Sequence, residues 1–200
     1  MTQLTFLIAE EEAPEIDISG LTYVPDFITS AEHDFLLSQI DQKPWLTDLK
    51  RRVQHYGYKY AYKARALNNN AYLGLLPDWL SSVCKKLHDD RIFLSIPDQV
   101  ILNEYLPGRG ISAHIDCVPC FADTIASLSL GSHCIMEFSN PKTGEKKSIA
   151  LEERSLIVLS GPARYEWQHA IPARKSDIIN GIKTERGRRV SLTFRNIILS

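Results

Sequence analysis

Apolar residues recur at helical spacing in two segments of the first half of the chain. Residues 29–39 carry one apolar stripe, and Thr29 with Glu32 fits a capping box at its start. The second stripe lies in residues 77–87 and consists of Trp79, Leu80, Val83, Cys84 and Leu87. These patterns predict two amphipathic helices.

After residue 98 the pattern changes to short runs of β-branched and aromatic residues, separated by glycine, proline and asparagine. We expect strands at residues 99–105, 125–130, 134–138, 147–151, 155–159, 166–171 and 189–198. Two helices followed by many short strands are typical of an α+β, mainly β domain. The pattern favours a sandwich or barrel braced by helices on one side.

Length and composition agree with one globular domain, because the chain has 200 residues, of which 44% are hydrophobic and 24% charged. No apolar run approaches the roughly 18 residues of a membrane span. The apolar stretch 4–9 has no basic residue before it, so we expect no signal peptide and a cytoplasmic protein.

The cysteines fit that compartment as free thiols rather than disulfides. They are Cys84, Cys117, Cys120 and Cys134. Cys117 and Cys120 have CxxC spacing, but one such pair without a second is weak evidence for a zinc or redox site.

A net charge of −1 conceals two segments of opposite sign. Residues 1–19, which we expect to be a loose lead-in, contain only acidic charges: Glu10, Glu11, Glu12, Glu15 and Asp17. Residues 42–65 are basic and contain Asp48 as their one acidic residue. A basic segment attracts polyanions, although a solvated face without an anionic partner is the alternative.

The strongest chemical signal is His114-Ile115-Asp116, with a further histidine at His169. On a strand, residues 114 and 116 would point to the same face. Two histidines and one carboxylate form the facial triad of non-haem Fe(II) oxygenases. A surface pair with an unrelated histidine is the alternative when HxD is considered alone.

Arg189 and Arg195 stand six residues apart on the strand expected at residues 189–198. They would share one face, while Val190, Leu192 and Phe194 would form the apolar face. Inward guanidinium groups require anionic partners, and a dicarboxylate would supply them. Two surface arginines on an edge strand are the alternative, and we expect that role for Arg186 and Arg188.

Several motifs follow one another in a set order. They are Asn103-Glu-Tyr105, Pro107-Gly108, His114-Ile-Asp116, Ser127-Leu-Ser-Leu-Gly131, His169 and Arg189–Arg195. In combination they resemble the AlkB family of Fe(II)- and 2-oxoglutarate-dependent dioxygenases, over roughly residues 20–198. The resemblance implies a double-stranded β-helix, or jelly roll, with an N-terminal helical extension, in a single domain over residues 20–200.

The resemblance also implies a site with Fe(II), 2-oxoglutarate and O2. His114, Asp116 and His169 would bind the iron. The residues that would hold 2-oxoglutarate are Asn103, Tyr105, Arg189 and Arg195. Ser191 departs from the family pattern, because many members carry asparagine there.

In this family the segment before the β-helix covers the nucleotide, and here it would be about residues 42–65. Its candidate substrate residues are Arg51, Arg52, Tyr56 and Tyr58. Cations for phosphates and aromatic rings for stacking suit DNA or RNA that is single-stranded or has a flipped base. Tyrosines at alternate positions equally fit the apolar face of a plain strand.

The substrate is left open by the sequence. Residues 51–58 and 160–169 most resemble the branch that hydroxylates wobble uridine in tRNA, without that branch's extra domains. Val118 stands where the DNA-repair prototype has an acidic residue that reads the base. We expect oxidation of an alkylated or modified base, by demethylation or hydroxylation. A protein side chain or small molecule is the alternative substrate, and a non-enzymatic binding module is a further one. Nothing in the sequence indicates a required protein partner or a membrane.

Overall fold

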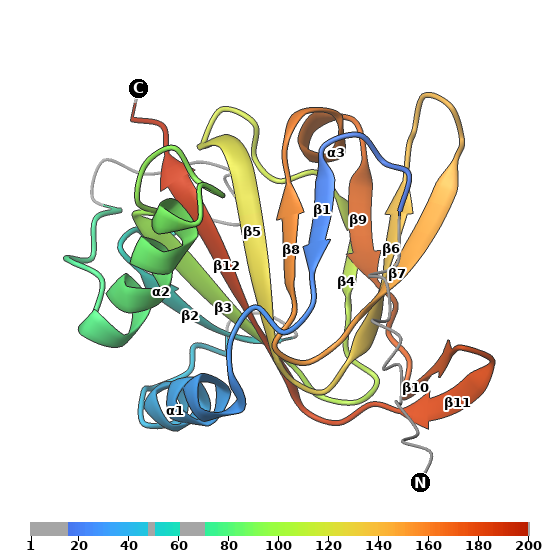
Figure 1. Ribbon diagram of the computed structural model, residues 1–200, viewed down its shortest axis with the longest axis horizontal. Coiled ribbons are helices and arrows are strands. Elements are labelled where there is room, and N and C mark those ends of the chain that lie inside the picture. Colours follow the sequence, from blue (N-terminus) through green and yellow to red (C-terminus); the bar gives the residue numbers. More distant parts are fainter. Residues whose placement is uncertain (1–15, 48–50, 61–70, 200) are drawn as a thin grey trace, which may run out of the picture.

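The computed structural model describes residues 16–47, 51–60 and 71–199, and two antiparallel sheets dominate it (Figure 1). The larger sheet has the order β1 (Leu21–Val24), β8 (Leu156–Leu159), β5 (Phe121–Gly131), β12 (Arg189–Ile197), β3 (Gln99–Tyr105), β2 (Arg52–Tyr56). The smaller sheet has the order β4 (Ile111–His114), β9 (Gln168–Ile171), β6 (Cys134–Ser139), β7 (Lys146–Leu151). A separate hairpin joins β10 (Ser176–Ile179) to β11 (Ile182–Glu185).

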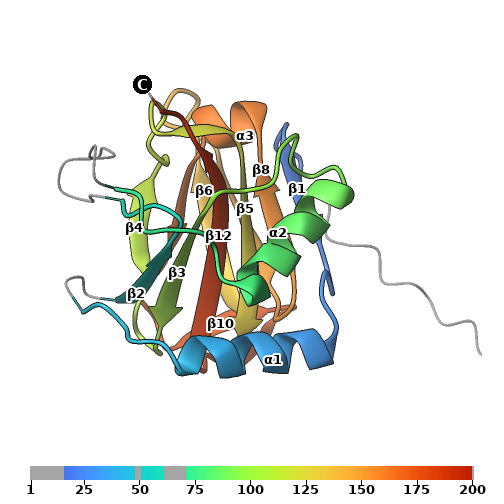
Figure 2. The ribbon, with the colours of Figure 1, turned by 90° about the vertical axis from the view of Figure 1, so that its left-hand side faces the viewer.

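One face of the larger sheet is covered by the helices α1 (Ser30–Asp41) and α2 (Asp78–Asp89), as Figure 2 shows. Apolar side chains from both helices pack there against alternate residues of the central strands. On β12 these residues are Val190, Leu192 and Phe194, all buried. The opposite face of the sheet is therefore free to carry polar groups.

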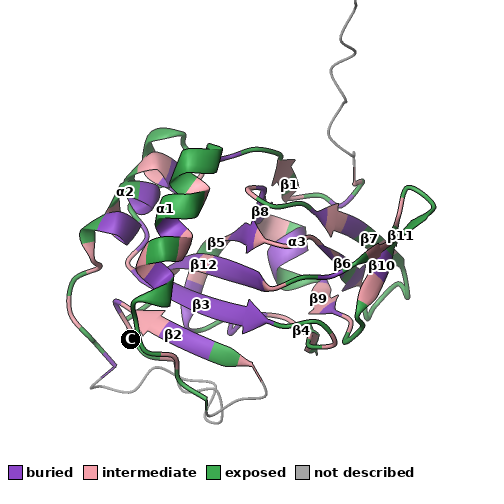
Figure 3. Cartoon of the chain, turned by 90° about the horizontal axis from the view of Figure 1, so that it is seen from below, coloured by how far each residue is buried: buried purple, intermediate pink, exposed green. Residues whose placement is uncertain are grey.

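Burial is continuous along the central strands, which are coloured purple over most of their length in Figure 3. All residues of β3 are buried, because one side of the strand faces the helices and the other faces the smaller sheet. This arrangement confirms the expected mainly β jelly roll with helices on one side.

The predicted elements agree closely with the structure. Thr29 caps α1 as expected: its Oγ1 accepts from the Glu32 N–H at 3.2 Å, and its own N–H donates to Glu32 Oε2 at 2.7 Å. Strand β3 has the predicted bounds, and most other strands differ by one or two residues. The expected strands did not include β1, β2, β4 or the β10–β11 hairpin, and the short helix α3 (Gly161–Tyr165) was not expected either.

Two expectations are wrong. Cys117 and Cys120 form a disulfide, because the turn between them brings their Cα atoms to 5.3 Å, whereas Cys84 and Cys134 are free and buried. Arg186 is not a surface residue. It is buried against Asp177 of β10, to which its Nη2 donates at 2.7 Å.

Arg188 is also paired rather than simply solvated, because it donates to Glu104 Oε1 at 2.7 Å and to Asp41. Most of the acidic lead-in, residues 1–15, lies outside the described residues. Within the described part of the chain, no helix is both long and apolar enough to cross a membrane. The cytoplasmic location stays a prediction.

Candidate metal centre

A cavity of about 480 Å³ lies between the two sheets. It is lined by the face of the larger sheet that is turned away from the helices, and by β4 and β9 of the smaller sheet. The lining is mainly apolar, with Ile125, Met136 and Ile157 among its residues, and a few polar side chains converge in it. Such a volume and lining are typical of a small-molecule site.

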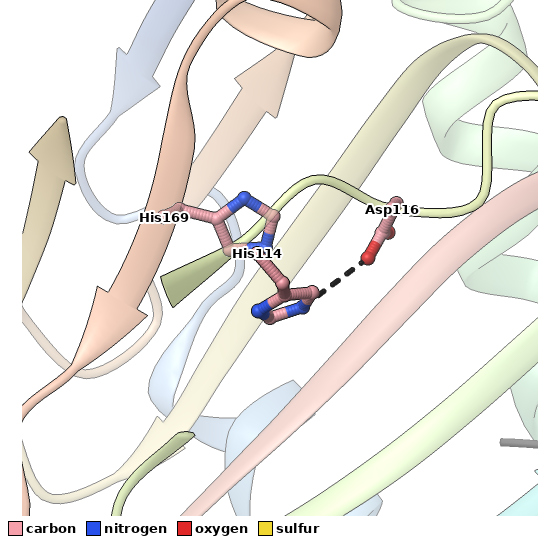
Figure 4. Close-up of side chains that lie close together, drawn as sticks. All are labelled: His114, Asp116 and His169. Atoms are coloured by element: carbon pink, nitrogen blue, oxygen red, sulfur yellow. Dashed lines mark ion pairs between the residues drawn. The ribbon is translucent and has the colours of Figure 1, made fainter. Parts of the chain in front are cut away.

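Two histidines and an aspartate meet at this cavity (Figure 4). His114 ends β4 and His169 lies opposite it on β9, with ring centroids 4.4 Å apart. Asp116 follows, and its Oδ1 lies 3.4 Å from His114 Nε2. One potential ligand atom from each residue lies within 4.8 Å of the others, which is close enough to bind one metal ion.

The expected reason for the His114–Asp116 juxtaposition is only partly correct. We expected both residues on one strand, but β4 ends at His114 and Asp116 lies in the loop that follows. His114 itself is oriented by its own strand, because its Nδ1 lies 2.8 Å from the Ser112 carbonyl and donates to it. That hydrogen bond leaves the Nε2 lone pair for a ligand.

The charges at this centre suit a divalent cation. Burial alone would raise the pKa of Asp116, but Arg195 and the neighbouring histidines hold it well below its usual range, so the group is a carboxylate. Burial lowers the pKa of His169 to about 4. A carboxylate and a neutral imidazole are the protonation states that metal binding requires.

Arg189 and Arg195 lie on the cavity face of β12, as their spacing predicted. Arg195 is engaged, because its Nε and Nη2 donate to Asp116 Oδ2 at 3.0 and 2.8 Å. Arg189 donates through Nη2 to Ser129 Oγ at 2.8 Å. Its Nε and Nη1 are buried and have no hydrogen-bond partner among the described residues.

Unsatisfied donors on a buried guanidinium are costly, so the cavity beside Arg189 is suited to an anion. Two further residues expected at this place, Asn103 and Tyr105, also line the cavity from the neighbouring strand β3. Asn103 Oδ1 accepts from Arg51 Nε at 2.7 Å. The structure therefore brings together every residue that the resemblance assigned to iron and 2-oxoglutarate.

The candidate substrate residues separate into two groups. Arg51 lines the cavity, whereas Arg52 points to the other face of the sheet and donates to Glu104 Oε1 at 2.7 Å. Tyr56 also lies on the helix side, where its ring packs edge-on against Trp79. Tyr58 packs against Tyr72, and residues 48–50 and 61–65 of the basic segment lie outside the described residues.

Some residues of the site were not assigned to it from the sequence. Tyr60, one of the alternating tyrosines of the basic segment, lines the cavity and packs against Phe121, at 5.4 Å between ring centroids. Ser129 holds Arg189, and its signal was its position on the cavity face of a strand paired with β12. Arg164 is buried beside the loop of Asp116, and no sequence pattern indicated that contact.

Comparison with known proteins agrees with the metal site that the cavity indicates. The family model of the 2OG-Fe(II) oxygenase superfamily matches residues 42–195. The chain is 39% identical over 206 residues to the "Alkylated DNA repair protein ALKBH8 homolog" of Arabidopsis thaliana, covering 92% of this chain and 60% of that protein. It is 38% identical over 205 residues to the "tRNA (carboxymethyluridine(34)-5-O)-methyltransferase ALKBH8" of Mus musculus, covering 89% of this chain and 30% of that protein.

The chain therefore spans less than two thirds of the length of either relative. Among solved structures it is similar to OsALKBH1, with a TM-score of 0.69 and 15% identity, over 88% of this chain and 96% of that one. At that identity the likeness concerns the fold alone.

Proposed function

The chain belongs to the 2OG-Fe(II) oxygenase superfamily and, within it, to the AlkB family, and from that premise we propose that it oxidises an alkylated or modified base in nucleic acid. Members of the superfamily use Fe(II), 2-oxoglutarate and O2. The observation that carries the proposal is the cavity in which the triad and the partly unpartnered Arg189 lie together.

In this proposal His114, Asp116 and His169 hold Fe(II), which fits their charges and the spacing of their ligand atoms. Bound Fe(II) with 2-oxoglutarate and O2 supplies the oxidation of a substrate C–H bond, with succinate and carbon dioxide as co-products. The chain's own contribution is to orient the ligands and to surround the reacting groups with a largely apolar cavity.

Arg189 would bind a carboxylate of 2-oxoglutarate, because its buried Nε and Nη1 have no hydrogen-bond partner among the described residues and a carboxylate oxygen accepts from such donors. Asn103 and Tyr105 line the same cavity from the adjacent strand β3 and would hydrogen-bond the same molecule. Arg195 lines the same cavity and would pair with the other carboxylate of 2-oxoglutarate, while its Nε and Nη2 donate to Asp116 Oδ2 and hold that side chain in place.

A nucleic-acid substrate is supported by the names of the relatives and by Arg51, a residue of the basic segment that lines the cavity. Arg51 and Tyr60 bring a cation and an aromatic ring to the cavity wall, which suits a base taken out of its stack. We propose that about residues 42–65 form a nucleotide-recognition lid on a domain of residues 20–200. Arg52 and Tyr56 are left out of the substrate contacts because they face the helices.

Mass spectrometry of reaction products tests this function. The purified protein receives Fe(II), ascorbate and 2-oxoglutarate together with methylated DNA and RNA oligonucleotides or bulk tRNA. We expect one nucleic acid to lose a methyl group or gain an oxygen atom, and His114→Ala to abolish that change. Formation of succinate without a change in any nucleic acid would contradict the proposed substrate and favour a protein or small-molecule substrate.

A further inference from the structure

Asp116 has fewer backbone restraints than the histidines around it. His114 ends β4, and its pairing with His169 of β9 is the last in that ladder. Residues 115–117 belong to no strand or helix, and a turn over residues 118–120 follows. A carboxylate in such a loop requires other contacts to hold its backbone in one place.

Arg164 makes those contacts from the far side of the loop. Its Nη1 donates to the Asp116 carbonyl at 2.9 Å and its Nη2 donates to the Cys117 carbonyl at 3.2 Å. The fork of the guanidinium thus bridges two consecutive carbonyls. The disulfide between Cys117 and Cys120 closes the same turn.

The burial of Arg164 suggests that these two bonds matter. The residue is 2% exposed, and its Nε has no hydrogen-bond partner among the described residues. A buried guanidinium costs free energy, and an apolar side chain of similar volume would fill the space at less cost. Holding the loop is what the guanidinium adds and an apolar side chain would not.

The origin of Arg164 in the chain gives the contact a second consequence. Arg164 belongs to α3, the short helix that immediately precedes β9, on which His169 lies. Helix α3 is itself fixed, because the Ala163 N–H donates to the Ser19 carbonyl at 3.0 Å and the Gly161 N–H donates to Asp123 Oδ1 at 3.2 Å. Arg164 therefore ties the segment that carries His169 to the loop that carries Asp116.

We propose that Arg164 is a positioning residue of the metal centre, which fixes the backbone of Asp116 and Cys117 and thereby sets the distance between the carboxylate and His169. This inference rests on the proposed function, because it takes Asp116 and His169 as metal ligands. Arg164 touches neither a metal nor a substrate. It acts through the loop that it holds, as outer contacts of metal ligands commonly do.

Metal affinity of the apoprotein tests the role without depending on turnover. Co(II) is titrated anaerobically into wild type, Arg164→Met and Arg164→Lys, and its absorption bands report both the dissociation constant and the ligand geometry. We expect Arg164→Met to weaken Co(II) binding by roughly 10- to 100-fold and to alter the bands. The Co(II) dissociation constant of Arg164→Lys should lie between those of wild type and Arg164→Met, because one ammonium group can still reach a carbonyl.

The matched control is Arg186→Lys, which makes the same substitution at another buried arginine, outside the cavity. We expect it to lower the melting temperature and leave the Co(II) dissociation constant at the wild-type value. Arg164 variants that bind Co(II) as wild type does would overturn the inference, and so would equal losses in Arg186→Lys and Arg164→Lys. If Arg164→Met does not fold, the two lysine variants decide.

Failure of the proposed metal centre would appear separately, because wild type itself would then bind Co(II) no better than His114→Ala does. Failure of the proposed nucleic-acid substrate would appear in the product analysis and would leave Co(II) binding unchanged. Once wild type is shown to bind Co(II) more tightly than His114→Ala, the Co(II) affinities of the Arg164 variants test the positioning role alone.

Discussion

Arg51 and Arg52 are neighbours in the sequence whose side chains serve opposite faces of one sheet. Arg51 donates to Asn103 in the cavity, while Arg52 pairs with buried Glu104 on the helix side. The sequence placed both in one basic segment and could not separate them, because a strand's register decides which of two adjacent residues faces inward. Arg51 and Arg52 carry the same charge, so the residues that they contact are what distinguishes them.

Replacing each arginine separately tests this division. We expect Arg51→Ala to weaken oligonucleotide binding and to reduce the slope of log affinity against log salt by about 1, as loss of one phosphate contact does. Arg52→Ala should leave the slope unchanged and lower the melting temperature, because Glu104 loses one of its partners. Binding isotherms at several salt concentrations measure the slopes. Equal flattening in both variants would contradict the assignment.

At the scale of elements, local sequence patterns were sufficient to predict a helix or strand where one of its faces is apolar. The alternation Val190, Leu192, Phe194 predicted β12 and placed Arg189 and Arg195 on the same face, which the structure shows. The patterns failed where the restraint comes from an element that they did not predict, such as α3 or the β10–β11 hairpin.

Three such failures have a physical cause. The strand expected from residue 166 begins only at Gln168, because α3 and its C-cap occupy the preceding residues. Asp116 is held by Arg164 and Arg195 rather than by a strand. The burial of Arg186 depends on Asp177, which the unrecognised β10–β11 hairpin brings to it.

That buried pair predicts an acid-sensitive stability. Burial alone would raise the pKa of Asp177, but the hydrogen bonds from Arg186 lower it below its usual range. A carboxyl with a depressed folded-state pKa stabilises above its unfolded pKa of about 3.9, and this contribution is lost as pH falls through the folded-state pKa. We therefore expect Asp177→Asn to be less stable than wild type at pH 7, by roughly 3–5 kcal/mol, with the gap narrowing below about pH 4.

Urea denaturation between pH 7 and pH 3 measures that gap. Glu185→Gln is the control, because it neutralises an exposed carboxylate of the same hairpin that pairs with exposed Lys183. Its free energy of unfolding should follow that of wild type over the whole range. A gap for Asp177→Asn that stays constant down to pH 3 would show that the pair does not titrate as its contacts indicate.

Over the whole molecule, the composition and the order of helices and strands predicted the architecture but not the strand order. The metal centre draws on β4, its following loop and β9, while Arg189 comes from β12 in the opposite sheet. Only the pairing of strands far apart in sequence closes the cavity. The ordered motif series predicted residues that line it, because most of its motifs lie on different strands of the two sheets.

A cavity between the two sheets links ligand binding to the stability of the whole fold. A ligand at 100 times its dissociation constant stabilises the folded state by about 2.7 kcal/mol, which corresponds to roughly 5–10 °C in a chain of this size. We expect Mn(II) to raise the melting temperature and 2-oxoglutarate to raise it further in the presence of Mn(II). Arg189→Met should keep the rise in melting temperature caused by Mn(II) and lose the further rise caused by 2-oxoglutarate. His114→Ala should lose both. Differential scanning calorimetry of the apoprotein with each addition measures them. An Arg189→Met variant that retains the full 2-oxoglutarate increment would show that the unpartnered donors of Arg189 do not bind the co-substrate.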